Sequence, residues 1–112
     1  MIAHNTFVDD LAAAVPEAAE TVRDHLDDQD GQLLIHILMA DLLRLTLRVF
    51  DEGQTDLARR VLGFVDRCLN EGDESVRNAV RVSFVEGYGY GPDEPEELLS
   101  LWPAGLRADL GR

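Results

Sequence analysis

GQLLIHILMADLLRLTLRVFDE, residues 31–52, is the longest stretch of this 112-residue chain that reads as a single helix. Thirteen of the eighteen positions from Leu33 to Phe50 are apolar, and they occupy more than one helical stripe. The first stripe consists of Leu34, Leu38, Leu42, Leu45 and Val49. A helix that is apolar around most of its circumference is normally buried. The pattern therefore predicts a central helix that the other helices surround.

The charges of this stretch argue against a membrane span, although its length is close to that of one. Asp41, Arg44 and Arg48 lie in its middle and C-terminal half, and a charge at the centre of a bilayer costs at least about 2.5 kcal/mol. Their spacing of three and four residues places them on one narrow strip. A polar slot in the core is one interpretation. We favour a strip that faces solvent or a neighbouring helix, because charged side chains are rarely buried without partners.

Helix-start and helix-stop residues divide the rest of the chain into shorter helices. Before the central helix, Asn5 is expected to cap a helix that reaches Ala14, and Pro16 to open one that reaches about Leu26. After Gly53, a fourth helix should run from residue 54 or 55 to about residue 70. A fifth, capped by Asp73, should reach about residue 86, and two short helices over residues 96–101 and 104–110 should form a tail. The prediction is an all-α fold, a compact bundle of about five main helices around residues 31–52 with a short C-terminal helical tail, in a single domain over residues 1–112.

The composition is that of a globular protein, with 46% hydrophobic and 29% charged residues. The single cysteine, Cys68, cannot form an internal disulfide, and residues 1–15 show no basic-then-apolar leader. We therefore expect a cytoplasmic protein.

Charge is the most informative property of the composition. Twenty-two acidic residues against ten arginines give a net charge of −12, which disfavours nucleic acid and membrane surfaces and favours basic partners. Residues 1–31 hold eight acids and one arginine, or −7, residues 92–112 hold five and two, or −3, and residues 32–91 hold nine and seven, or −2. A partner attracted by this charge should therefore meet the two ends of the chain.

Two groups of acids are the candidate partner-binding residues. The first group is Asp24, Asp27, Asp28 and Asp30, and the second is Asp93, Glu94, Glu96 and Glu97. The first group lies at a helix C-terminus, where negative charge opposes the helix dipole. Such acids either belong to a solvated loop or are kept for a cationic partner. An EF-hand calcium loop is excluded, because its ligand positions 26 and 37 are Leu and Ile.

The segment from Gly87 to Pro92, GYGYGP, interrupts the helical pattern. It is not a phosphate-binding loop, because no strand precedes it and no helix begins directly after it. Two interpretations remain: a linker whose tyrosines pack on the domain, or an exposed loop that offers Tyr88 and Tyr90 to a partner.

The sequence contains no motif for catalysis, a cofactor or a metal. The three histidines lack metal-ligand spacing with Cys68 or with one another, and no histidine near Cys68 in sequence would activate its thiol. We therefore expect neither an enzyme nor a metal protein. A water-filled cleft that joined His36 to Asp41 would be the observation to reopen that question.

One region links the chain to known proteins. Residues 61–86 combine an apolar helix, an acidic Gly72-Asp73-Glu74 turn and the segment Ser83-Phe84-Val85-Glu86; residues 36–44 and 102–107 flank them with further motifs. This pattern resembles a family of small, mostly bacterial all-helical proteins of unknown function with a vSFvE-type helix, and it leaves out residues 1–30. A structural explanation also exists, in which Phe84 and Val85 pack, Ser83 bonds a helix carbonyl and Glu86 pairs with an arginine.

Some proteins of that kind look similar to immunity proteins encoded beside bacterial toxins. Together with the charge, this resemblance implies a non-enzymatic protein-binding module that neutralises a basic partner, such as a nuclease toxin, with carboxylates that mimic phosphates. The alternative is a structural module, such as a homodimer, in which the charge only maintains solubility.

Overall fold

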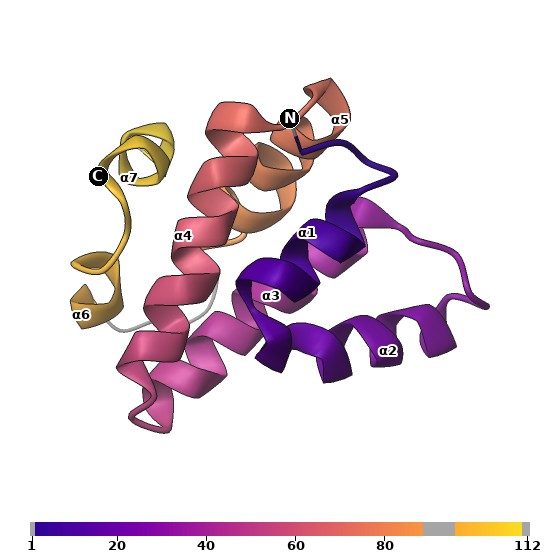
Figure 1. Cartoon of the computed structure of the whole chain (residues 1–112). Helices are drawn as coiled ribbons and strands as arrows, with labels where there is room; N and C mark the ends of the chain where they lie inside the picture. The colour runs from indigo at the N-terminus through magenta and orange to yellow at the C-terminus, as the bar shows by residue number, and fades with distance from the viewer. Residues whose placement is uncertain (1, 89–95, 111–112) are drawn as a thin grey trace.

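The computed structural model describes residues 2–88 and 96–110, and for Glu96 it describes the backbone alone. Figure 1 shows its helices packed around two long ones, α3 and α4. In chain order the elements are α1 (Phe7–Ala14), the 3₁₀ turn η1 (Pro16–Ala18), α2 (Ala19–Asp28), α3 (Ile35–Asp51), α4 (Thr55–Glu71), α5 (Glu74–Ala79), the π-helical segment η2 (Val80–Val85), α6 (Glu96–Leu99) and α7 (Ala104–Leu110). The predicted all-α class is confirmed. No described helix has both the length and the apolar character that a membrane crossing requires.

Helix α3 is the central buried helix that the sequence predicted. Leu38, Met39 and Leu42 are fully buried, and α2, α4 and η2 all pack against α3. The helix begins at Ile35 rather than near residue 31, because Asp30 and Gly31 adopt positive φ angles of 54° and 80° that end the preceding helical path. The predicted stripe is therefore wrong at Leu34, which precedes the helix and is 39% exposed.

The N-terminal segment is tied to the turn between α4 and α5. Ile2 donates to the Glu71 carbonyl at 3.0 Å and accepts from the Asp73 amide at 2.9 Å. Glycine is required at this turn, since a Cβ atom at Gly72 would lie 2.3 Å from the Cys68 carbonyl oxygen. The prediction that Asn5 caps α1 is wrong, because Thr6 precedes the first helical residue.

The fifth helix begins as predicted and then widens. Asp73 caps it by accepting the Val76 amide at 2.9 Å, and this bond, with a second from the His4 amide, lowers the pKa of Asp73. From Val80 the backbone follows π-helical geometry. Phe84 is fully buried in this segment, as predicted. The Ser83 hydroxyl lies 3.0 Å from His36 Nδ1, so its contact is with α3 rather than with its own helix.

The C-terminal tail packs on α4, on the opposite side from α1 and α2 (Figure 1). Helix α6 ends at Leu99, two residues earlier than predicted, while α7 has its predicted bounds. Trp102 is the main anchor: its ring lies 5.7 Å from that of Phe84 and 4.9 Å from that of Tyr88, between centroids. Asp66 of α4 adds a polar contact by accepting the Leu106 amide at 3.1 Å.

Replacing Leu42 by alanine should test the central role of α3. Leu42 is fully buried, so truncation should lower the free energy of unfolding by about 2–5 kcal/mol through the cavity it leaves. Ile37 lies on the same helix but is 41% exposed, and Ile37→Ala should change stability by no more than about 0.5 kcal/mol. Urea unfolding followed by Trp102 fluorescence measures both. Equal losses in the two variants would contradict the burial pattern.

Candidate functional site

The first group of predicted acids is fully presented to solvent. Asp24, Asp27 and Asp28 lie on the C-terminal half of α2 and Asp30 follows it, and all four are exposed. Within the described parts of the chain, none of these four carboxylates takes part in an ion pair or a hydrogen bond.

Some carboxylates elsewhere in the described chain are paired with arginine. Arg60 of α4 binds Glu17, lowering the pKa of that carboxyl through its hydrogen bonds. Arg81 binds Asp109 through its Nε at 3.3 Å. The end of α2 differs, because its four acids lie within seven residues and none of them forms an ion pair among the described residues.

Helix α2 divides these acids between two grooves. Asp24 and Asp28 are one helical turn apart and face α3, whereas Asp27 faces α1. Asp30 lines neither groove. The acids of α2 therefore lie on two sides of a single helix.

The groove between α2 and α3, which we call the polar groove, encloses about 430 Å³. Its lining residues are Thr21, Asp24, His25, Asp28, Asp41, Arg44, Leu45 and Arg48. The strip of Asp41, Arg44 and Arg48 thus faces a neighbouring helix, as we expected, and Asp41 forms an ion pair with Arg44 along it. The strip supplies cations opposite the acids of α2.

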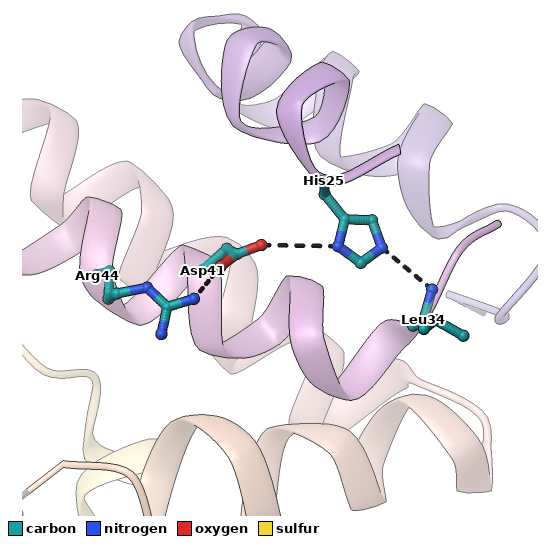
Figure 2. Close-up of polar contacts among 4 residues, drawn as sticks. All are labelled: His25, Leu34, Asp41 and Arg44. Atoms are coloured by element: carbon teal, nitrogen blue, oxygen red, sulfur yellow. Dashed lines mark hydrogen bonds and ion pairs between the residues drawn. The ribbon is translucent and has the colours of Figure 1, made fainter. Parts of the chain in front are cut away.

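His25 connects the two walls of the polar groove (Figure 2). Its side chain is buried, with a residue exposure of 2%, and Nε2 accepts the Leu34 amide at 3.1 Å. An accepting Nε2 carries no proton, so the ring is neutral with its hydrogen on Nδ1. Nδ1 lies 3.6 Å from Asp41 Oδ2, which is longer than a hydrogen bond, and within the described chain it has no hydrogen-bond partner. His25 therefore fastens α2 to the start of α3 and keeps one donor directed at Asp41.

We did not single out His25 from the sequence and associated His36 with Asp41 instead. His36 lies elsewhere, against Ser83. The sequence does contain a signal for the burial of His25. Ala18, Val22 and His25 are spaced four and three residues apart, so His25 continues the apolar stripe of α2. That spacing indicates an inward-facing histidine.

On its other side α2 forms a second groove with α1, which we call the apolar groove. It encloses about 320 Å³, which is at the lower end of the range for small-ligand pockets. The lining residues are Val8, Leu11, Ala12, Ala18, Ala19, Val22, Arg23, Leu26 and Asp27. Only Arg23 and Asp27 among them are charged, and both belong to α2.

The second group of predicted acids and the two tyrosines before it are only partly covered by the described residues. Tyr90, Asp93 and Glu94 lie outside the described residues, as does the side chain of Glu96. Glu97 is exposed on α6, across α4 from α2 (Figure 1). Tyr88 is 5% exposed and packs edge-on against Trp102. For Tyr88 the structure therefore agrees with the packed linker and not with an exposed contact.

Potential catalytic groups are sparse in the described part of the chain. No three histidine, cysteine, aspartate or glutamate side chains among the described residues are grouped so that they could hold a metal ion. Cys68 is fully buried on α4, and burial raises the pKa of its thiol to about 12. The thiol is therefore protonated at neutral pH and behaves as a small core side chain.

Comparison with known proteins assigns a family but no activity. A family described as a domain of unknown function, DUF7674, matches residues 8–110. The match contains all the motifs on which the family resemblance was based, and it extends further towards the N-terminus than that resemblance did. No curated protein and no solved structure matches the chain.

The bond from Leu34 to His25 can be tested with a pair of amide substitutions. His25→Asn is too short to accept the Leu34 amide, so it should lower the free energy of unfolding by about 1–3 kcal/mol through an unpaired buried donor. His25→Gln places an amide oxygen near the position of Nε2 and should cost less. Urea unfolding gives the stability, and hydrogen exchange at the Leu34 amide should be faster in the asparagine variant. Identical behaviour of the two variants would contradict the assigned bond.

The state of Cys68 predicts its reactivity. At pH 8 an unfolded cysteine, with a pKa of about 8.5, is partly thiolate, whereas the folded thiol, with its pKa raised to about 12, is not. Alkylation by iodoacetamide should therefore be slow in buffer and fast in denaturing urea, as followed by mass spectrometry. Rapid modification of the folded protein would show that the thiol is accessible and activated.

Proposed function

The chain belongs to the DUF7674 family of domains of unknown function, and we propose that it is a non-enzymatic binding module for a basic protein partner. The observation that carries the proposal is the run of four exposed carboxylates on and after α2 that form no ion pair among the described residues, namely Asp24, Asp27, Asp28 and Asp30. Four like charges so close together repel one another and are unfavourable at a helix C-terminus. A cationic partner relieves both costs.

The net charge of −12 supports the same proposal at longer range. An acidic protein accelerates its encounter with a basic one, because the summed field steers the two together before contact. The field is strongest around residues 1–31, which carry −7 of the total and include α2. The approach should therefore be directed towards α2 and the two grooves beside it.

A narrower proposal concerns the kind of partner. A basic nuclease toxin has a surface adapted to phosphates, and a row of carboxylates offers it charges of the same sign. The chain would then act as an immunity protein. This narrower proposal rests on the charge and on the motif resemblance of residues 61–86.

The alternative is a structural module that forms a homodimer, and the apolar groove is the observation that favours it. Charge counts against this alternative. Two copies that met through the groove would bring their acidic α2 helices close together, and like charges at an interface oppose association. Sedimentation at low and high salt separates the two functions. A dimer that tightens as salt screens the acids would support the homodimer.

The proposal is tested by removing the four α2 charges. The variant Asp24→Asn/Asp27→Asn/Asp28→Asn/Asp30→Asn should slow association with the physiological partner by about tenfold or more at low salt, because it loses electrostatic steering. The matched control is Asp51→Asn/Glu52→Gln/Glu74→Gln/Glu86→Gln, which changes the net charge equally at four exposed sites away from α2.

Wild-type, variant and control proteins are used as baits in the source lysate at low salt and at about 0.5 M salt, where the Debye length is well below 10 Å. Basic proteins kept by wild type and control but lost by the variant are the candidate partners, and association rates are then measured with each purified candidate. If the α2 variant and the control bind alike, the carboxylates of α2 are not the binding surface.

A further inference from the structure

The apolar groove between α1 and α2 is open because of two small side chains. Its floor is formed by Leu11, Ala18 and Val22, which are buried to between 0% and 9% exposure. Ala12 of α1 and Ala19 of α2 form part of the walls, and both are exposed. Large side chains at these two positions would cover the floor. With alanine there, apolar surface continues from the core to the outside.

The groove is bounded by helices on both sides, since α1 and α2 are joined through the short turn η1. A depression between two helices accepts the ridge of a third one, whose apolar residues recur at intervals of three and four positions. Val8 and Ala12 are one turn apart on α1, and Ala19, Val22 and Leu26 follow the same rule on α2. Both walls therefore offer the spacing that a helical segment needs.

Charge selects the occupant of this groove. Asp27 lines it, and the two helices that border it also carry the exposed acids Asp9 and Glu20. A second copy of the chain would bring further acids to these helices, whereas a segment that carries lysine or arginine beside its apolar stripe would compensate them. Arg23 lies one turn before Asp27, so an acid or a free carbonyl of the occupant fits at that end.

We infer that the apolar groove between α1 and α2 binds an amphipathic basic helix of a protein partner. The inference rests on the proposed function and adds the surface and the structural class of the ligand. The apolar stripe of the segment packs on Leu11, Ala18 and Val22, and its cations lie near Asp27 and the other acids of α1 and α2.

The probe is a synthetic peptide of about 18 residues, long enough for a bound helix, with leucine at positions i, i+3, i+4 and i+7 and lysine at most others. Two control peptides accompany it: one has the same composition in scrambled order, and one has glutamine in place of lysine. Each is titrated into the full-length protein, with amide shifts recorded by NMR. The patterned basic peptide should shift the amides of Val8, Ala12, Ala19 and Leu26, and its Kd should be about tenfold lower than that of either control, equivalent to about 1.4 kcal/mol.

A matched pair of variants tests the groove on the side of the protein. Ala12 and Ala13 are neighbours on α1 and both are exposed, but only Ala12 lines the groove. Glutamine is uncharged and favours helices, so the substitution leaves the net charge unchanged and α1 intact. Ala12→Gln should raise the Kd of the patterned peptide by about tenfold, while Ala13→Gln should change it by less than about twofold.

The outcomes separate this inference from the proposed function. If the scrambled basic peptide binds as tightly as the patterned one and Ala12→Gln has no effect, attraction is by charge alone, so the groove inference is wrong while the proposed function stands. If the glutamine peptide binds as tightly as the lysine peptide, the occupant of the groove is not selected by charge, so the groove inference is wrong, while the proposed function is still decided by the variant that lacks the four α2 charges. Absence of shifts at the groove amides with the patterned peptide also overturns the inference.

Discussion

The burial of α3 against several neighbouring helices is the constraint on which the rest of the structure depends. A helix with apolar side chains on more than one stripe cannot be satisfied by a single neighbour, so it must recruit segments from before and after it in the chain. Helices α4 and η2 come from the following half, and α2 comes from the preceding one. Helix α3 also carries a charged strip, which consists of Asp41, Arg44 and Arg48. This strip determines where the polar groove between α2 and α3 forms.

Sequence periodicity was sufficient to predict those features that depend on residues close together in the chain. The burial of Leu42, the cap at Asp73 and the bounds of α7 all follow from apolar spacing and helix-end chemistry. The predictions fail where a backbone angle or a distant partner decides. The start of α3 depends on the positive φ angles at Asp30 and Gly31, and the contact of Ser83 depends on His36, which is remote in sequence.

The candidate site was also predictable only in part, because some of its features depend on local sequence and others on contacts between helices. Exposure of the four α2 acids follows from their charge, but their division between two grooves depends on how α2 is rotated against α1 and α3. That rotation is fixed by inward side chains such as Val22 and His25, and their partners lie on other helices. In the sequence these four acids form one group at the end of a helix. In the structure Asp24 and Asp28 lie beside arginines of α3 in the polar groove, whereas Asp27 lies beside alanine and leucine side chains in the apolar groove.

The tether between Ile2 and Gly72 also bears on the order of folding. It joins residues about seventy positions apart, and the ion pair from Glu17 to Arg60 spans 43 positions, so both close long loops at a substantial entropic cost. The contacts between α3 and α4 join consecutive elements and carry a much smaller cost. The α3–α4 hairpin should therefore form first, and the α1–α2 unit should dock late. Local opening then affects first α2, which borders both grooves, and α1, which borders the apolar groove, so a partner can rearrange this surface without unfolding the core.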